Sequence, residues 1–381
     1  MARLDEPLAI KAMRLPNRLA LAPTTCNYAD ENGLVTDANL GYYRPRSRDL
    51  GLVIVESCAV RADGRIAPGS IGSWDDRQIP GLKRLVDTIK GEGAATILQL
   101  NHAGARSSPL APGIAGPSPS GVAFRPDVPP TPLSERQIGE FVAGYAAAAK
   151  RAQQAGFDGV EVHGAHLYLI SQFLSPLANK RTDRYGGDGA ARATFAAEVI
   201  GAIRKGCGAD FPIVFRLNAV EAVEGGQTLD DAVVAARVAA KAGADAIHVS
   251  ALMQAEWLES NGQKRFKGVA APRKEMPFGA YAPYAARIKG AVSVPVIAVG
   301  KLADHTVAGE LLAEGVADVI AICRQLIVDP HTATKMLAGH SDEIVRCDEC
   351  MGCFTSIQKP GPLKCTVNRD LIGEPQYKNR G

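Results

Sequence analysis

The sequence predicts a (β/α)₈ barrel, and three observations support this fold class. Short apolar segments alternate with Ala-rich helical segments along the chain of 381 residues, an order typical of parallel α/β folds. The phrases AGFDGVEV, AGADAIHV and EGVADVIAI share one form, in which a helix ends at Gly and a buried strand follows. An open, doubly wound sheet would normally carry a phosphate fingerprint after its first strand, and neither GxGxxG nor GxxxxGK(S/T) is present. Together these observations favour the closed barrel.

The individual elements are predicted from apolar runs and from helical periodicity. Eight strands are expected at residues 18–23, 52–57, 96–100, 160–163, 213–217, 246–250, 294–300 and 318–324. Helices between them are expected at residues 138–155, 193–205, 230–242 and 306–314, among others. Residues 101–135 are rich in Pro, Gly and Ser, and they predict a long loop on the C-terminal face of the barrel. We expect the barrel to span residues 1–340 and a tail to pack on it over residues 341–381.

Composition narrows the class of protein. The chain is 46% hydrophobic and 22% charged, as is usual for a globular protein in water. Lys and Arg number 43 against 40 Asp and Glu, with no run of like charge, which argues against a nucleic-acid partner. Neither a signal peptide nor an apolar segment long enough to span a membrane is found in the sequence. We therefore expect a cytoplasmic protein.

The eight cysteines are unevenly spaced. Half of them are scattered along the chain, and the other half lie close together in the tail as Cys347, Cys350, Cys353 and Cys365. In a large cytosolic chain, clustered cysteines indicate metal or cluster ligation more than disulfides.

The end of the fourth strand carries three polar rings, His163, His166 and Tyr168. In a parallel barrel this end lies on the face that carries the chemistry. Two imidazoles and a phenol offer hydrogen-bond donors for an oxyanion and a source of protons. The alternatives are a histidine satisfied in the core or a metal site, and the stretch lacks a third ligand at the spacing of a zinc helix motif.

Other strand ends also carry polar groups, which the barrel would gather around one pocket. The first three strands end in Pro23 to Cys26, in Glu56 and Ser57, and in Gln99, Asn101 and His102. The fifth, seventh and eighth end in Arg216, in Gly300 and Lys301, and in Cys323 and Arg324. Strands seven and eight are where such barrels commonly bind phosphate. An amide suits an imide edge and a fixed guanidinium suits an anionic ring position. The set therefore predicts a phosphorylated heteroaromatic such as FMN.

These motifs resemble those of the old yellow enzyme family, the NADH:flavin oxidoreductase barrels. The resemblance rests on LQLNHAGARSS, on GFDGVEVHGAHLYLISQFLSPLANKRTDRYGG and on CRQLIVDP, and it covers nearly the whole chain. The tail CDECMGC…C further resembles the branch with 2,4-dienoyl-CoA reductase and trimethylamine dehydrogenase. That likeness implies a [4Fe-4S] cluster on the four tail cysteines, with zinc or free thiols as the alternatives.

The resemblance also implies roles for the strand-end residues. Those expected to contact the flavin ring are Pro23, Thr24, Thr25, Ser57, Gln99 and Arg216, of which Thr25 tunes the potential and Arg216 stabilises the anionic reduced form. Those expected at the phosphate are Gly300, Lys301, Cys323 and Arg324. His163 and His166 match the pair that grips a substrate carbonyl oxygen, and Tyr168 matches the proton donor.

Three departures from the family pattern stand out. Cys323 replaces the usual Gly beside the phosphate, and Leu167 replaces the usual Gly between His166 and Tyr168. The cysteine spacing is C-x2-C-x2-C-x11-C, which is one residue shorter in its middle interval than the cluster pattern.

The resemblance implies an ene-reductase-type oxidoreductase that passes hydride from NADH or NADPH through FMN to an activated C=C bond. Three other functions are weighed: amine dehydrogenation or demethylation in the same barrel, an electron-relay subunit, and tRNA modification. The last is disfavoured because no basic run is present. The expected partners are the alkene and the nicotinamide, and the sequence leaves open a homo-oligomer or a redox partner protein.

Overall fold

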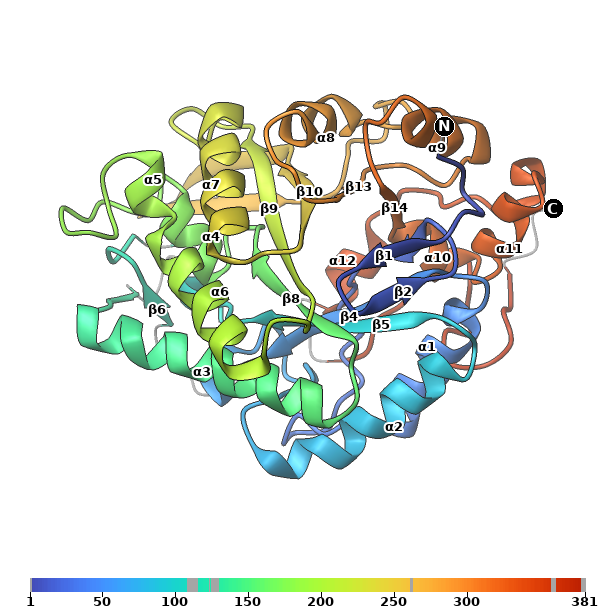
Figure 1. Ribbon diagram of the computed structural model, residues 1–381, viewed down its shortest axis with the longest axis horizontal. Coiled ribbons are helices and arrows are strands. Elements are labelled where there is room, and N and C mark those ends of the chain that lie inside the picture. The colour runs from blue at the N-terminus through green and yellow to red at the C-terminus, as the bar shows by residue number, and fades with distance from the viewer. Residues whose placement is uncertain are drawn as a thin grey trace.

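The chain folds into a closed barrel of eight parallel strands, as predicted (Figure 1). The computed structural model describes residues 2–107, 116–122, 124, 130–260, 263–357 and 361–377. Around the barrel the strands follow the order β10-β13-β14-β3-β4-β5-β8-β9. Their bounds are β3 Leu19–Leu21, β4 Leu52–Ala59, β5 Ala95–Asn101, β8 Gly159–Gly164, β9 Ile213–Glu221, β10 Ala246–Leu252, β13 Val296–Val299 and β14 Val319–Ile322. Each barrel strand therefore pairs with the barrel strand that follows it along the chain, and the last one, β14, pairs with the first, β3.

The strands form because each is a short run of apolar residues that can be buried on both sides. Every residue of β4, β5, β8 and β10 is buried, the pattern expected where helices cover the outside of a parallel sheet. The longer helices are α1 Asp37–Ser47, α2 Ile79–Lys90, α3 Glu135–Gln154, α6 Thr194–Cys207, α7 Leu229–Ala242, α8 Ala282–Lys289 and α9 His305–Ala313. The shorter ones are α4 Leu169–Leu174, α5 Gly189–Arg192, α10 Arg324–Val328, α11 Thr332–Leu337 and α12 Gly352–Ile357.

Helix α7 shows how the repeated phrase works. Thr228 and Asp231 form a reciprocal capping box that starts the helix. Gly243 ends it in the left-handed conformation, with φ of 114°. The chain then enters β10 directly, so the predicted helix–Gly–strand order is confirmed here.

A hairpin that the sequence analysis did not predict closes the N-terminal end of the barrel. It consists of β1 Leu8–Ile10 and β2 Met13–Leu15, which pair antiparallel. Ile10 and Met13 are buried in one apolar cluster with Leu52 and Val214, which lie near the starts of their strands. Each of these strands has 3 residues, which is too few for a pattern of alternating apolar and polar residues to be recognised in the sequence. Two further strand pairs, β6 Pro117–Ser118 with β7 Thr131–Pro132 and β11 Gln254–Ser260 with β12 Gln263–Val269, lie outside the barrel.

The described part of the tail packs on the barrel beside α10 and α11, at the red end of the chain in Figure 1. Buried Asp329 accepts hydrogen bonds from Lys335 Nζ at 2.7 Å, Val345 N at 3.0 Å and Tyr377 Oη at 3.2 Å. Arg46, buried in α1, donates to the carbonyl of Leu371 at 2.9 Å. The tail is therefore tied to the barrel at several points along its length.

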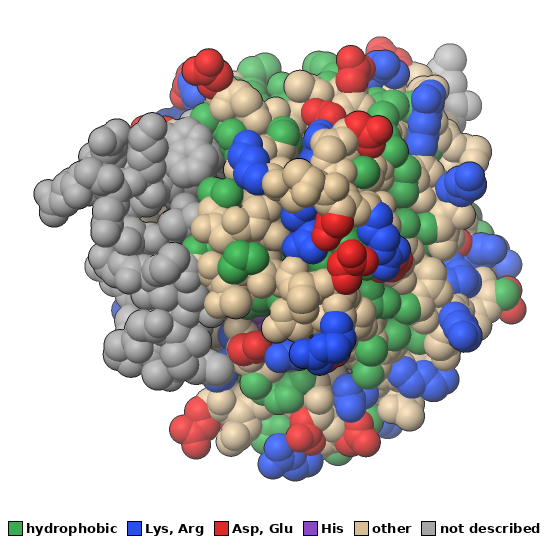
Figure 2. All heavy atoms as spheres, turned by 90° about the vertical axis from the view of Figure 1, so that its left-hand side faces the viewer, with side chains coloured by type: hydrophobic (Ala, Val, Ile, Leu, Met, Phe, Trp, Pro, Cys, Tyr) green, Lys and Arg blue, Asp and Glu red, His purple; other side chains and the backbone are tan. Residues whose placement is uncertain are grey.

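On the face turned to the viewer in Figure 2, the described residues form no large patch of a single charge. Basic and acidic side chains are interspersed there, with apolar ones between them. Among the described helices, none has the length and apolar character needed to cross a membrane.

Candidate active site

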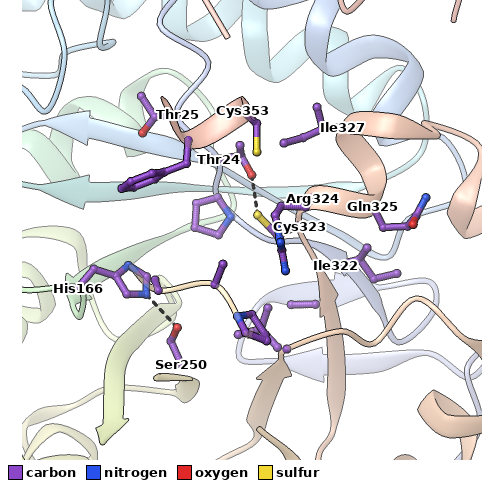
Figure 3. A pocket seen from close by; sticks show the side chains of 18 of the residues that line it. Thr24, Thr25, His166, Ser250, Ile322, Cys323, Arg324, Gln325, Ile327 and Cys353 are labelled. Atoms are coloured by element: carbon purple, nitrogen blue, oxygen red, sulfur yellow. Dashed lines mark hydrogen bonds between the residues drawn. The ribbon is translucent and has the colours of Figure 1, made fainter. Parts of the chain in front are cut away.

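A cavity of about 490 Å³ lies at the C-terminal ends of the barrel strands (Figure 3). Its lining includes every barrel residue that the sequence analysis proposed for catalysis or cofactor binding: Pro23, Thr24, Thr25, Ser57, Gln99, His163, His166, Tyr168, Arg216, Gly300, Lys301, Cys323 and Arg324. Residues up to 301 positions apart in the sequence thus meet because parallel strands all end on one face. The individual roles given to them stay predictions.

At one end of the cavity lie His163, His166 and Tyr168, which we call the histidine end. The ring centroids of His163 and His166 are 4.9 Å apart, and those of His163 and Tyr168 are 5.2 Å apart. His163 is buried at the end of β8, whereas His166 and Tyr168 are partly exposed to the cavity. His166 Nε2 lies 2.9 Å from Ser250 Oγ, at the end of β10 (Figure 3). The three rings therefore form one compact group.

The turn that presents these rings is held in an unusual backbone conformation. His166 and Leu167 both have positive φ, at 62° and 55°, a region that residues with a Cβ rarely adopt. Hydrogen bonds fix the turn: Asn218 Oδ1 accepts from His166 N at 3.2 Å, and Arg106 Nη1 donates to His166 O at 2.5 Å. The replacement of the usual Gly by Leu167 is thus accommodated, and Leu167 is fully buried.

Buried polar groups extend this support behind the turn. Gln227 Nε2 donates to the carbonyl of Asn218. The carboxylate of Glu221, at the end of β9, accepts from Gln227 N at 3.0 Å and from Ser175 Oγ at 2.6 Å. Burial raises the pKa of Glu221 to about 7. The turn therefore rests on a chain of buried hydrogen bonds that includes one group titrating near neutrality.

The electrostatics of the histidine end favour neutral rings. Burial, with the positive charge of Arg216 next in importance, holds the pKa of His163 and of His166 well below the usual histidine range. Burial raises the pKa of Tyr168. At neutral pH the site therefore offers uncharged imidazole N–H donors and a protonated phenol, which can stabilise an oxyanion and supply a proton.

A set of buried polar groups that contacts the cavity residue Gln99 was missed by the sequence analysis. Glu161 on β8 accepts from Gln99 Nε2 at 2.7 Å and lies 2.7 Å from His248 Nδ1. Glu161 engages one of the two N–H donors of the Gln99 amide, so its second N–H and its carbonyl oxygen can face a ligand. A carboxylate inside the apolar run GVEVHG was the signal that could have revealed Glu161, because an acid in a buried strand needs partners.

Two buried nitrogens of the residues that line the cavity lack a hydrogen-bond partner within the described part of the chain. They are Arg216 Nε and His163 Nδ1, and buried polar atoms are normally paired. A heteroaromatic ring with anionic and carbonyl edges would supply such partners. The residues of the cavity thus fit FMN by their donor chemistry.

The other end of the cavity, which we call the phosphate end, is formed by Gly300, Lys301, Cys323 and Arg324. Gly300 has φ of 123°, and a Cβ there would lie 2.8 Å from the ring of Tyr281, so only glycine fits. The thiol of Cys323 contacts Thr24 Oγ1 at 3.1 Å (Figure 3). The side chain of Cys323 that replaces the usual Gly is thereby engaged with the first strand.

A carboxylate from the tail also reaches the phosphate end. Glu349 Oε1 forms an ion pair with Lys301 Nζ at 2.8 Å, and its Oε2 lies 3.9 Å from Arg324 Nη2. The sequence analysis gave the tail no part in the cavity, yet Glu349, Cys347, Met351 and Cys353 all line it. Nothing in the tail sequence specifies this contact, because it depends on how the tail folds back.

Some strand-end residues expected at the pocket do not reach it. Cys26, Glu56, Asn101 and His102 are buried and are not among the residues that line the cavity. Cys26 Sγ contacts Glu56 Oε1 at 2.5 Å, and the ring of His102 packs on Phe141. The expectation was wrong for these four. For Glu56, which directly precedes the cavity residue Ser57 on β4, the reason is that successive side chains on a strand point to opposite faces. The sixth strand, for which no pocket residue was predicted, contributes Ser250 instead.

The four tail cysteines lie around a second, smaller cavity of about 20 Å³. Backbone N–H groups of Glu349 and Val367 donate to the sulfurs of Cys347 and Cys365, both at 3.4 Å. No three His, Cys, Asp or Glu side chains within the described ranges are grouped so that they could hold a metal ion. The thiols share a cavity without standing in ligating positions, so the predicted cluster is not confirmed.

The fold and the cavity together define a parallel α/β barrel with a polar pocket at its C-terminal face. Comparison with known proteins agrees. A family model described as the NADH:flavin oxidoreductase / NADH oxidase family matches residues 3–343. An NADPH dehydrogenase from Halalkalibacterium halodurans is 34% identical over 333 residues, which cover 86% of this chain and 92% of that protein. The chain belongs to the NADH:flavin oxidoreductase / NADH oxidase family, which confirms the predicted resemblance.

Longer relatives and solved structures are also similar. A protein named metal reductase from Desulforamulus reducens is 40% identical over 379 residues, which cover 99% of this chain and 55% of that protein. The structure of a 2-naphthoyl-CoA reductase matches with a TM-score of 0.88 at 30% identity, over 97% of this chain and 57% of that one. Morphinone reductase matches with a TM-score of 0.74 at 26% identity, over 89% and 90%. The chain thus spans about half the length of the first two of these relatives.

Proposed function

We propose that this chain is an FMN-dependent reductase of activated C=C bonds, with NADH or NADPH as the electron donor. The family supports an oxidoreductase that uses FMN and a nicotinamide. The observation that carries the finer proposal is the group of His163, His166 and Tyr168 at the cavity, in which the ring of His163 lies 4.9 Å from that of His166 and 5.2 Å from that of Tyr168. Two neutral donors beside a protonated phenol match the needs of an α,β-unsaturated carbonyl or enoyl substrate.

The residues would divide the work as follows. FMN, when bound, supplies the redox chemistry that moves two electrons and one hydrogen from the nicotinamide to the β-carbon of the alkene. His163 and His166 hold the substrate carbonyl oxygen and stabilise the negative charge that develops there. Tyr168 gives its proton to the α-carbon and regains one from water. The alkene thus gains two hydrogens and the nicotinamide is oxidised.

The cofactor would be held by residues in the middle of the cavity and at its phosphate end. Gln99 and Arg216 would contact the polar edge of the ring, with Thr25 and Ser57 beside it. Gly300, Lys301 and Arg324 would bind the phosphate, since backbone N–H groups and cations are its natural partners. Arg216 is 6% exposed, and its Nε is unpaired among the described residues, so it is placed to pair with a ligand.

Anaerobic purification followed by two titrations tests the proposal. Protein with native secondary structure should be yellow, lose its visible absorption when NADH or NADPH is added, and regain it when cyclohexenone is added. A colourless protein whose folded form causes no spectral shift of added FMN would rule out the cofactor. Reduction by the nicotinamide without reoxidation by any enone or enoyl thioester would rule out the substrate class.

The same experiment separates the other functions weighed for this barrel. Reoxidation by an acceptor protein alone would identify an electron-relay subunit. Reduction of the protein by amines would identify an amine dehydrogenase. Steady-state turnover of small enones by the isolated chain favours the ene-reductase over both. Oligomeric state and a redox partner protein stay predictions, as does a cytoplasmic location.

For the tail, we propose a [4Fe-4S] cluster on Cys347, Cys350, Cys353 and Cys365, with the division of the chain at residues 340 and 341. Two observations support it: all four residues line the second cavity, and N–H groups are directed at two of the sulfurs. Thiolates bind iron–sulfur clusters and zinc alike. Ligation would require the sulfurs to draw closer together than they stand.

Metal analysis of anaerobically purified protein decides the matter. A cluster predicts about four irons per chain and a broad absorption near 400 nm that dithionite bleaches. One zinc per chain, or no metal, would discard the cluster and leave the barrel chemistry untouched. A Cys350→Ala variant should lose the iron and keep the FMN.

A further inference from the structure

The ion pairs of Glu349 at the phosphate end have a consequence for cofactor binding. The side chain of Glu349 is 18% exposed, and its two cationic neighbours, Lys301 and Arg324, are 12% and 16% exposed. Three charged side chains thus lie together at low exposure, where Coulomb interactions are stronger than in open water. The carboxylate of Glu349 lowers the net charge of this group of side chains from +2 to +1.

The backbone places Glu349 there despite an unfavourable conformation. Glu349 has φ of 55° and Lys301 has φ of 56°, both in the left-handed region that residues with a Cβ seldom adopt. Lys301 Nζ also donates to the carbonyl of Lys274 at 2.9 Å. The geometry is therefore fixed from both sides of the contact, by the strand end on one side and by the tail on the other.

We propose that Glu349 is an internal anion that occupies the phosphate subsite and competes with the phosphate of FMN. This inference rests on the proposed function and adds a residue to the cofactor site. A carboxylate and a phosphate both need the Lys301 ammonium and the Arg324 guanidinium, and two anions at one pair of cations repel each other. FMN binding must therefore displace the carboxylate of Glu349 from these cations.

Flavins with and without a phosphate provide the test. Full-length protein is stripped of flavin, and the dissociation constants of FMN and riboflavin are measured by fluorescence quenching. Riboflavin lacks the phosphate, so it cannot compete with Glu349. The Glu349→Gln variant should bind FMN about tenfold more tightly than the wild type, a change typical of removing one close like charge. Its affinity for riboflavin should not change.

The neighbouring acid supplies the matched control. Asp348 is exposed, so Asp348→Asn removes the same charge from the same segment outside the phosphate end. It should leave both affinities close to those of the wild type. If Glu349→Gln does not fold, Glu349→Ala takes its place, since it removes the same carboxylate.

The outcomes are separable. Weaker or unchanged FMN binding in the Glu349 variants, with a wild type that binds FMN, would overturn the competition and leave the proposed function standing. Equal tightening of FMN and riboflavin would overturn it too, because the effect would not involve the phosphate. A wild type that binds neither flavin would overturn both this inference and the cofactor assignment.

Discussion

The two ends of the cavity are built on different physical principles. At the histidine end, neutral side chains are held by hydrogen bonds from within the barrel, as between His166 and Ser250. At the phosphate end, charged side chains are held by ion pairs, and one partner, Glu349, comes from the tail. Hydrogen bonds among buried neutral groups are directional and are insensitive to salt. Ion pairs are less directional, and salt weakens them.

The difference indicates which properties depend on which part of the chain. In the proposed function, the geometry for proton transfer and oxyanion binding is set by strands that the barrel already fixes. The proposed competition by Glu349 makes cofactor affinity depend in addition on a segment outside the barrel. Changes at the histidine end should therefore alter turnover with little effect on FMN affinity, and changes nearer the phosphate end should do the reverse.

The largest effect is expected for Tyr168→Phe. Removing the phenol hydroxyl removes the proton donor, so the step with enones should slow by about 10² to 10³-fold. Reduction by the nicotinamide and FMN affinity should stay as in the wild type. Stopped-flow traces of the two half-reactions provide the measurement. Equal slowing of both halves would show that Tyr168 acts by shaping the pocket instead.

A loss of about 10²-fold in enone turnover is expected for His163→Ala, comparable to the loss of one oxyanion donor. His163→Asn keeps an N–H donor and should retain part of the activity. Steady-state rates at saturating nicotinamide distinguish the two variants. Wild-type rates in His163→Ala would remove the histidines from the mechanism.

The support behind the histidine end predicts a pH dependence of stability. The pKa of Glu221 is raised to about 7 by burial, and a glutamate in an unfolded chain titrates near 4.3. Between these values the folded protein holds a proton that the unfolded chain releases, so stability from this group falls as the pH rises. The loss is on the order of 3 kcal/mol across the window.

Glu221→Gln cannot titrate and should lack this fall. The difference in urea unfolding free energy between variant and wild type should therefore grow in favour of the variant from pH 4.3 to pH 7. Other titrating groups cancel in this difference. Parallel stability curves for the two proteins would mean that Glu221 is not the titrating group.

The smallest effect is expected for Arg216→Met, which lies between the two ends. Losing a charge-assisted hydrogen bond to the ring should weaken FMN binding about tenfold and lower the midpoint potential of the bound flavin by a few tens of millivolts. Flavin titration and a spectroscopic redox titration give both values. A changed potential with unchanged affinity would place Arg216 outside hydrogen-bonding distance of the ring.

Much of the barrel could be predicted from the sequence because its strands are apolar runs separated by helices with clear ends. Each of the eight predicted strands overlaps an observed one, as for residues 160–163 and β8 at Gly159–Gly164. The cavity residues followed from the rule that strand ends share a face. The side-chain alternation that turns Glu56 away from the cavity depends on strand register, which the sequence alone does not give.

What could not be predicted was contact between distant segments. Glu349 meets Lys301 only because the tail folds back onto the barrel, and Glu161 pairs with Gln99 and His248 only once β5, β8 and β10 have taken their places in the closed barrel. Such contacts leave no local pattern in the sequence, unlike the helix caps of α7. The αL turn at His166 and Leu167 was equally hidden, since propensity disfavours it for a branched side chain.

The segment from Cys347 to Cys353 forms part of the wall of two cavities. Cys347, Met351 and Cys353 line both the large cavity of the barrel and the small one among the thiols. Because the two cavities share this wall, a ligand that fills one of them changes the shape of the other. Thermodynamic linkage requires the resulting change in binding affinity to be the same in both directions. Whatever factor a ligand among the thiols changes the affinity for flavin by, flavin must change the affinity for that ligand by the same factor.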